Sequence, residues 1–332
     1  MTPALADSDL LARIPIAADV ADAARLLDGV AVHTPLLRAP LLEHGGGRVF
    51  LKCEIFQQTG SFKFRGAYNC LARIPENRRA GGVVAFSSGN HAQGVAAAAK
   101  LLGLPAVIVM PRDAPALKRE RTAAHGAEVV LYDRERESRE EIAGRIARER
   151  NAILVPPYDH PHVIAGQGTV GIEICDQLEK LAPDIVLVPA SGGGLLAGIA
   201  LAVKECHPSA RLVAVEPAGF DDHAKSFVSG RRERNAKLSG SICDSLLAPM
   251  PGELTFEITR KLVNEAVSVS DEEVRAAVGF AFRELKLVLE PGGAVALAAL
   301  FAGKVDAGGK TVAVVLSGGN ADPVTFASAI GA

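Results

Sequence analysis

The sequence lacks tryptophan, is poor in other aromatic residues, and carries no excess of charge of either sign. Its 332 residues include 36 Lys and Arg against 38 Asp and Glu, and aromatic residues make up only 5%. A nucleic-acid-binding surface needs clustered positive charge and stacking side chains, so this composition argues against nucleic acid as a partner. The near-neutral charge also provides no attraction to an anionic membrane.

Paired cysteines and long apolar runs are also missing. The five cysteines are scattered without a CxxC motif, which argues against a disulfide framework and a cysteine zinc site. The longest uncharged stretch, residues 185–203, is interrupted by Pro189, Ser191 and three consecutive glycines, so it fits a strand, a turn and a helix better than a membrane span. The first residues do not form a signal peptide. We therefore expect a cytoplasmic protein with reduced thiols and no membrane partner.

Short β-branched runs alternate with helix-like segments, and 48% hydrophobic residues are enough for a sizeable core. Apolar strands separated by helices are typical of parallel sheets covered on both faces, so the pattern predicts an α/β fold. Strands are expected at residues 82–86, 106–110, 128–131, 185–189, 212–216 and 311–316, and helices at 92–102, 115–125 and 138–150.

Two nucleotide-binding patterns are present only in part. Residues 166–171 match G-x-G-x-x-G, but a proline-rich loop precedes them where the dinucleotide fingerprint requires a strand. The tripeptide Gly309-Lys310-Thr311 is similar to the end of a P-loop, but Lys304 stands where its first glycine is needed. Neither pattern predicts a nucleotide site.

Three other glycine-rich turns each follow a predicted strand. They are Ser87-Ser88-Gly89-Asn90-His91, Ser191-Gly192-Gly193-Gly194-Leu195 and Ser317-Gly318-Gly319-Asn320. Ligands of open parallel sheets bind beyond the carboxyl ends of the strands, where glycines let backbone N–H groups approach an anion. One such turn alone fits a helix cap, but three together favour a phosphate or carboxylate ligand.

Lys63 lies between Phe62 and Phe64 in a segment poor in acidic residues. Apolar surroundings disfavour the charged form of an amine, and a neutral amine is a nucleophile. Taken alone, Lys63 fits a surface lysine whose stem packs on apolar neighbours. Together with the anion-binding turns, it indicates a Schiff base to pyridoxal phosphate.

The motifs GSFKFRGAYN, SSGNHAQG, AGQGT, SGGGLLAGIA, LEPGG and LSGGN occur in this order along the chain. In these motifs the chain resembles the serine/threonine dehydratases and serine racemases, which are pyridoxal phosphate enzymes of the tryptophan-synthase-β type (fold type II). The resemblance implies a two-domain, three-layer parallel-sheet fold and a homodimer. Its large, cofactor-binding domain would comprise residues 1–79 and 156–332, and its small, substrate-clamping domain residues 80–155.

The resemblance also implies roles for individual residues. Lys63 would bind the cofactor covalently and move the substrate's Cα proton, with Phe62 against the pyridine ring and Ser317 at its nitrogen. Asn90 would hydrogen-bond the cofactor's 3′-oxygen, and Glu290 would lie near the cofactor's edge. The phosphate would rest on the backbone of Ser191, Gly192, Gly193, Gly194 and Leu195. The substrate carboxylate would be received by the turn of Ser87, Ser88, Gly89, Asn90 and His91.

The implied activity is β-elimination from a hydroxyamino acid such as L-threonine or L-serine, giving a 2-oxo acid and ammonia. Ser88 keeps racemase activity as an alternative, because in the racemases a serine at this position exchanges the substrate proton on the face opposite the lysine. Ser88 also fits the N-cap of a helix. Phe86 and Tyr158 are more typical of the dehydratases. Arg139 matches a carboxylate-binding arginine of the racemases, which makes 3-hydroxyaspartate a candidate substrate, although it also fits a solvated helix face. A non-catalytic ligand-binding protein is the remote alternative.

A cation site is implied after the predicted strand at 212–216. In the resembling racemases a Glu, a backbone carbonyl and an Asp bind a divalent cation, and the matching positions here are Glu216, the Phe220 carbonyl and Asp222. An all-oxygen ligand set suits Mg²⁺ or Ca²⁺. A turn with solvated acidic residues is the alternative.

Overall fold

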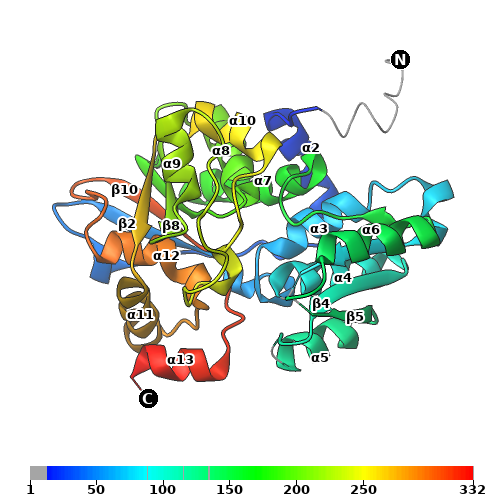
Figure 1. Cartoon of the computed structure of the whole chain (residues 1–332). Helices are drawn as coiled ribbons and strands as arrows, with labels where there is room; N and C mark the ends of the chain where they lie inside the picture. The colour runs from blue at the N-terminus through cyan, green and yellow to red at the C-terminus, as the bar shows by residue number, and fades with distance from the viewer. Residues whose placement is uncertain (1–12, 88, 115, 134, 332) are drawn as a thin grey trace, which may run out of the picture.

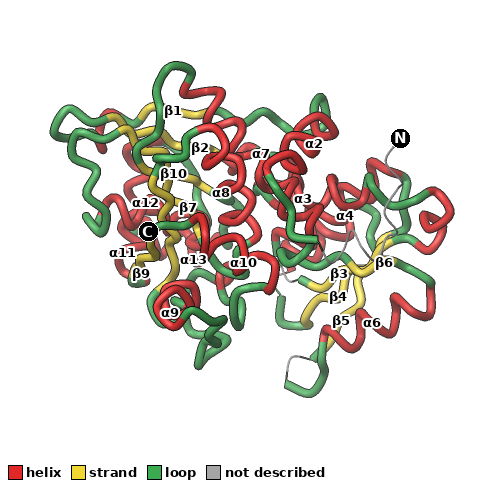
Figure 2. Tube along the Cα trace, turned by 90° about the horizontal axis from the view of Figure 1, so that it is seen from above, coloured by secondary structure: helices red, strands yellow, loops and turns green. Residues whose placement is uncertain are grey.

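The structure is a computed structural model that describes residues 13–87, 89–114, 116–133 and 135–331. Two β-sheets lie side by side, with the smaller one to the right of the larger one in both views (Figures 1 and 2). The larger sheet has the order β1-β2-β10-β7-β8-β9, and every neighbouring pair is parallel except β1 with β2. Its strands are β1 (Leu36–Arg38), β2 (Arg48–Cys53), β7 (Ile185–Pro189), β8 (Arg211–Pro217), β9 (Glu265–Val269) and β10 (Thr311–Leu316).

Helices cover both faces of the larger sheet, as the apolar strands predict. Alternate residues of one strand point to opposite faces. Leu187 and Val213 face α11 (Asp271–Phe280) and α12 (Pro291–Phe301), whereas Val186 and Val188 face α7 (Pro161–Leu178) and α8 (Gly194–Cys206). Figure 1 shows these two helix layers below and above the sheet. The resulting three-layer α/β architecture confirms the predicted fold class.

The smaller sheet is entirely parallel in the order β5-β4-β3-β6. Its strands are β3 (Val83–Phe86), β4 (Ala106–Pro111), β5 (Glu128–Tyr132) and β6 (Ile153–Leu154). Helix α4 (Asn90–Leu102) packs on one face and α6 (Arg139–Arg150) on the other. Phe64 and Leu71 of α3 (Lys63–Leu71) join the first of these cores, so the helix that begins with Lys63 packs against α4, which covers the smaller sheet.

The G-x-G-x-x-G pattern lies inside α7 and serves helix packing. A Cβ on Gly166 would lie 2.7 Å from the Arg65 carbonyl oxygen, and one on Gly168 would lie 2.7 Å from the Gly198 carbonyl oxygen. These glycines therefore let α7 approach α3 and α8 closely, which agrees with the prediction that the pattern is not a nucleotide site.

The remaining elements surround the two sheets. No helix in the described part of the chain is long and apolar enough to cross a membrane. The other α-helices are α2 (Ala17–Leu27), α5 (Ala116–Ala124), α9 (Asp222–Ser229), α10 (Glu253–Leu262) and α13 (Pro323–Ile330). Short 3₁₀ segments are η1 (Pro40–Leu42), η2 (Glu54–Phe56), η3 (Gln58–Gly60), η4 (Glu76–Gly81) and η5 (Asp244–Leu246), and a π-helical turn, η6 (Ala281–Leu285), follows α11.

Candidate active site

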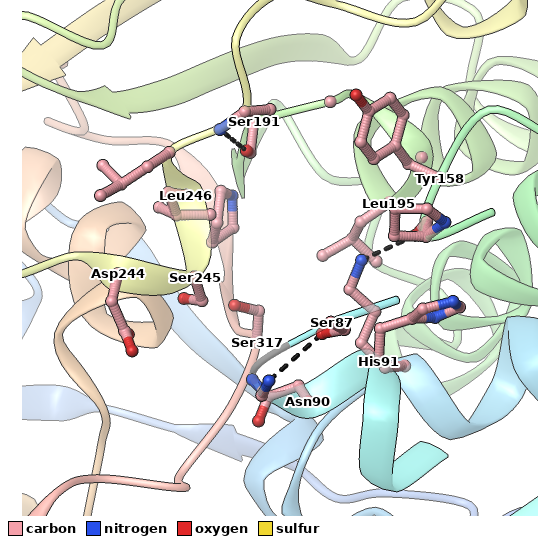
Figure 3. Close-up of a pocket in the computed structure, with 18 of the residues that line it drawn as sticks. Ser87, Asn90, His91, Tyr158, Ser191, Leu195, Asp244, Ser245, Leu246 and Ser317 are labelled. Carbon is pink, nitrogen blue, oxygen red and sulfur yellow. Dashed lines mark hydrogen bonds between the residues drawn. The ribbon is translucent and has the colours of Figure 1, made fainter. Parts of the chain in front are cut away.

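A pocket lies where β3, β7 and β10 end, so the three glycine-rich turns meet around one space. Figure 3 shows Ser191 and Tyr158 on one side of this space and Ser87, Asn90 and His91 on the other. Ser88 lies outside the described residues. All the other residues predicted to bind cofactor or substrate line the pocket: Phe62, Lys63, Ser87, Gly89, Asn90, His91, Arg139, Ser191, Gly192, Gly193, Gly194, Leu195, Glu290 and Ser317.

Lys63 is the first residue of α3, and its amine faces the pocket. Nζ donates a hydrogen bond of 2.8 Å to the Pro157 carbonyl oxygen and lies 5.1 Å from the centre of the Phe62 ring. Burial lowers the pKa of the amine to about 8, although the Glu290 carboxylate opposes this shift. Phe64 points into the core beneath the smaller sheet. The amine is therefore flanked by one phenylalanine, Phe62, and not by the two that the sequence suggested.

The turn after β7 forms the N-terminus of α8. Gly193 has a φ of 92°, a conformation that glycine adopts without strain. A Cβ on Gly192 would lie 2.3 Å from the Tyr158 ring, so only glycine lets the chain pass so close to that ring. The first N–H groups of a helix have no acceptor within the helix and carry a partial positive charge. This end of the pocket is therefore suited to an anion such as a phosphate.

The turn after β3 forms the N-terminus of α4. The Gly89 N–H donates to Ser87 Oγ over 3.2 Å, and α4 begins at Asn90. His91 Nε2 lies 3.0 Å from the Val155 carbonyl oxygen, which requires a proton on Nε2. Burial and the nearby Lys63 charge lower the pKa of His91 to about 3, so its ring is neutral. Here too, a helix N-terminus faces the pocket and suits a carboxylate.

Glu290 connects the turns after β3 and β10. Its Oε1 accepts a hydrogen bond of 2.5 Å from Asn90 Nδ2, and its N–H donates to the Gly318 carbonyl oxygen. Burial, with a contribution from the Asp244 carboxylate, raises the pKa of Glu290 to about 7. The adjoining Ser317 accepts a backbone hydrogen bond from Phe62, so the end of β10 is joined to the start of α3. These contacts fix the wall opposite the α8 terminus.

Arg139 is on the pocket wall at the start of α6. Its guanidinium carbon lies 5.3 Å from the centre of the Phe86 ring, and Nε donates to Glu140 Oε1 over 2.8 Å. The neighbouring Glu140 carboxylate holds the pKa of Arg139 above its usual value, against the effect of burial. The side chain is therefore a fixed positive charge at the pocket, and not solely part of a solvated helix face.

The predicted cation ligands Glu216 and Asp222 come together beside the α8 terminus. Both carboxyl groups are buried, and ligand-type atoms of Glu216, Asp222 and His223 all lie within 4.8 Å of one another. Burial and the Asp222 carboxyl raise the pKa of Glu216 well above its usual value, and burial raises that of Asp222 to about 7. Phe220 is buried in the turn between β8 and α9. His223 is the member of this cluster that sequence reasoning missed.

Two further pocket residues were also missed or only weakly indicated. Lys118 of α5 and Asp244 of η5 line the mouth and form an ion pair of 2.7 Å. The family resemblance implies only a position near the substrate entrance for Asp244, and no local pattern distinguishes Lys118, which lies in a helix that carries many charges. Tertiary packing alone brings the two residues together.

Comparison with known proteins connects this geometry to a family. The model of the family described as "Pyridoxal-phosphate dependent enzyme" matches residues 28–318. The chain is 45% identical to an L-threo-3-hydroxyaspartate ammonia-lyase from a Pseudomonas species, over 93% of this chain and 97% of that protein. It is 43% identical to an L-threonine ammonia-lyase from Thermotoga maritima, over 92% of this chain and 75% of that protein.

A solved structure has the same fold. Maize serine racemase superposes with a TM-score of 0.89 at 36% identity, covering 96% of this chain and 97% of that one. The residues matched by the family model include the turns after β3 and β7, Ser317 and the helix that begins with Lys63. The chain therefore belongs to the family of pyridoxal phosphate-dependent enzymes.

Proposed function

We propose that this enzyme is an ammonia-lyase that converts a hydroxyamino acid into a 2-oxo acid and ammonia. The observation that carries the proposal is the Lys63 amine, which has a lowered pKa and shares one pocket with two helix N-termini suited to anions. The similarity to ammonia-lyases that act on 3-hydroxyaspartate and threonine supports the same conclusion.

The residues around the pocket fit pyridoxal phosphate. The α8 terminus, from Ser191 to Leu195, would hold the phosphate, because it is a helix N-terminus that lines the pocket. Phe62 would pack against the ring, Asn90 and Glu290 would lie at its edge, and Ser317 at its nitrogen. When bound, the cofactor supplies an electron sink that makes the substrate's Cα–H acidic.

Lys63 acts as the base in this proposal. A neutral amine takes the Cα proton, and the β-hydroxyl leaves as water, so the Cα–H and Cβ–O bonds both break. Hydrolysis of the released product consumes one water and frees ammonia, and the net change is loss of ammonia. The Pro157 carbonyl oxygen, which accepts a hydrogen bond from the amine, would orient it whenever it is not joined to the cofactor. The Ser87–His91 turn binds the substrate carboxylate, which orients the Cα–H bond toward Lys63.

Arg139 favours a substrate with a second carboxylate. A guanidinium group pairs with a carboxylate through two parallel hydrogen bonds, and Arg139 lines the same pocket as the α4 terminus. We therefore infer that 3-hydroxyaspartate is preferred over L-threonine and L-serine.

The two-domain division also belongs to this proposal. Residues 80–155, which contain the smaller sheet, would form the substrate-clamping domain, and residues 1–79 and 156–332 the cofactor-binding domain. The position of the pocket among turns from both sheets supports a clamp of this kind.

A divalent cation at Glu216, the Phe220 carbonyl and Asp222 would support the α8 terminus. We also propose a homodimer in the cytoplasm, in keeping with the five free cysteines.

One experiment tests the proposed activity. The purified holoenzyme is incubated with L-threo-3-hydroxyaspartate, L-threonine or L-serine, and 2-oxo acid, ammonia and the D-isomer are measured. We expect oxo acid and ammonia in equal amounts, fastest with 3-hydroxyaspartate. Accumulation of the D-isomer without ammonia would instead identify a racemase, and turnover of none of the three would refute the proposal.

A further inference from the structure

The cluster of Glu216, Asp222 and His223 at the start of α9, with the neighbouring Asn235, contains several buried acceptor atoms that have no hydrogen-bond donor. Among the described residues, ten buried side-chain nitrogen and oxygen atoms have no partner, and three of them are Asp222 Oδ2, His223 Nδ1 and Asn235 Oδ1. An unpaired buried polar atom costs free energy, so native proteins keep few of them. Three in one place indicate a missing positive partner.

All three unpaired atoms are acceptors. Asn235 Nδ2 donates to Asp222 Oδ1 over 2.6 Å and to the Ala248 carbonyl over 3.0 Å, and since both of those atoms accept, the amide orientation is fixed with Oδ1 unpaired. A bound water has two protons at most, whereas a divalent cation accepts electron pairs from several atoms at once. The lone pairs therefore suit a cation better than a water.

His223 is held in the tautomer that leaves a nitrogen lone pair free. Its Nε2 lies 2.9 Å from the Ser191 carbonyl oxygen, which only a protonated nitrogen can approach as a hydrogen-bond donor. Nδ1 of the neutral ring then carries the lone pair. Histidines that bind metals in proteins almost always donate their other ring N–H to a carbonyl or carboxylate, as His223 does here.

Glu216 is oriented by the same helix. Its two oxygens accept the backbone N–H groups of His223 and Ala224, at 2.9 and 3.0 Å. Each carboxylate oxygen has a second lone pair, so Glu216 still has ligand capacity. The side chains of Glu216, Asp222 and His223 are all fully buried. Ligand-type atoms of two acids and a histidine therefore lie within 4.8 Å of one another, on side chains already held by hydrogen bonds.

We propose that His223 is a nitrogen ligand in the cation site and that the site accordingly selects a first-row transition-metal dication, such as Mn²⁺, over Mg²⁺ or Ca²⁺. Imidazole nitrogen suits first-row transition metals, of which Mn²⁺ is the one that also suits carboxylate oxygens, whereas Mg²⁺ and Ca²⁺ prefer oxygen alone. This inference builds on the cation site of the proposed function and changes its chemistry, because the resemblance implied oxygen ligands alone.

The same histidine connects the cation to the anion-binding turn. Ser191, whose carbonyl oxygen accepts from Nε2, is the first residue of the turn that precedes α8, and a Cβ on Gly193 would lie 3.0 Å from the His223 ring. A metal on Nδ1 would fix the ring and thereby fix the backbone of this turn. The cation would act on cofactor binding through position, without touching the reacting atoms.

Manganese is the probe that tests the nitrogen ligand. The holoenzyme is stripped of metals with a chelator and titrated with Mn²⁺, with free Mn²⁺ followed by electron paramagnetic resonance. Pulsed measurements on the bound ion report coupling to ¹⁴N. We expect histidine-type ¹⁴N coupling, which changes to ¹⁵N coupling when the protein is labelled with ¹⁵N-histidine. Mn²⁺ should bind at least about tenfold more tightly than Mg²⁺.

A variant and a matched control complete the test. His223→Gln should lose the ¹⁴N coupling and at least about tenfold in Mn²⁺ affinity, while His207→Gln, at the other end of α8, should change neither. Bound Mn²⁺ without ¹⁴N coupling in the wild-type protein, or an absence of Mn²⁺ binding, would overturn the proposal. If His223→Gln does not fold, the ¹⁵N-histidine experiment on the wild-type protein decides alone. Because no turnover is measured, failure of the proposed lyase activity would leave this result unaffected, and the reverse also holds.

Discussion

Lys118 of α5 donates to the Asp244 carboxylate over 2.7 Å and so joins the two sides of the pocket mouth. Lys118 also lies beside the turn after β3, since a Cβ on Gly89 would be 3.9 Å from Nζ. The ammonium group therefore adjoins the proposed site of the substrate carboxylate while it is paired with an acid. A substrate carboxylate would compete with Asp244 for the same charge.

This competition predicts that substitutions of Lys118 and of Asp244 change KM in opposite directions. Lys118→Met should raise KM, because it removes a positive charge from the carboxylate site, whereas Asp244→Asn should lower KM, because it releases that charge. We expect changes of about two- to fivefold, since a partly exposed ion pair is worth at most about 1 kcal/mol. Steady-state kinetics with 3-hydroxyaspartate measure both. If both variants raised KM alike, the ion pair would have only a structural role.

The lowered pKa of the Lys63 amine predicts that the rate of cofactor attachment depends on pH. The pKa of its amine is about 8 instead of the usual 10.5, so the neutral, reactive form is already about one tenth of the total at pH 7 and increases as the pH rises through 8. The rate at which apoenzyme combines with pyridoxal phosphate, followed by visible absorbance, should therefore rise with a midpoint near pH 8. Lys63→Ala should show no such absorbance band. A midpoint above pH 10 would contradict the assigned environment.

The position of Arg139 on the pocket wall predicts selectivity for 3-hydroxyaspartate over L-serine. Arg139→Gln should reduce kcat/KM for 3-hydroxyaspartate by about ten- to a hundredfold, the worth of a hydrogen-bonded charge pair, and leave L-serine within about threefold. Arg145→Gln provides the control, because Arg145 lies on the same helix and pairs with Glu149 at the surface. Equal losses with both substrates would show that Arg139 does not read the second carboxylate.

Removal of the proposed cation should lower the free energy of unfolding. Without it, the buried carboxyl groups of Glu216 and Asp222 repel each other or must take up protons. Saturating the protein with Mn²⁺ at a hundred times its Kd should stabilise it by about 2.7 kcal/mol, seen as a higher Tm than in excess chelator. The double variant Glu216→Gln, Asp222→Asn should show no difference between the two conditions. An equal Tm for the wild-type protein with and without Mn²⁺ would exclude the site.

Alanine substitutions at two helical glycines should change the free energy of unfolding in opposite directions. Gly168→Ala should destabilise the fold by about 1–3 kcal/mol, the usual cost of overpacking, because its Cβ would lie 2.7 Å from both the Gly198 carbonyl oxygen and Val20. Gly144→Ala in α6 meets only the end of the Arg148 side chain, so alanine's helix propensity should stabilise it by up to about 1 kcal/mol. Urea unfolding of both variants checks this, and stabilisation by Gly168→Ala would show that α7 and α8 are not packed so closely.

Local patterns in the sequence were sufficient for the fold class and for most of the pocket. The strands expected at 185–189 and 311–316 match β7 and β10 in full, and the glycine turns after β3, β7 and β10 do line one pocket. Strands β2 and β9 were missed because neither is a continuous apolar run: Arg48 and Lys52 interrupt β2, and Glu265 and Ser268 interrupt β9.

The sequence by itself determined the alternation of apolar strands and helices, the places where glycine is required, and the lysine within a phenylalanine-rich segment, because each of these is a property of neighbouring residues. Only the tertiary structure decided which side chains face one another. The Phe64 side chain lies on the core-facing side of α3 and so points away from the Lys63 amine. Lys118 forms an ion pair with Asp244 across the pocket mouth, and the His223 ring lies beside the Glu216 carboxyl because α9 folds back on β8. Such contacts depend on how the elements pack, and no spacing along the chain encodes them.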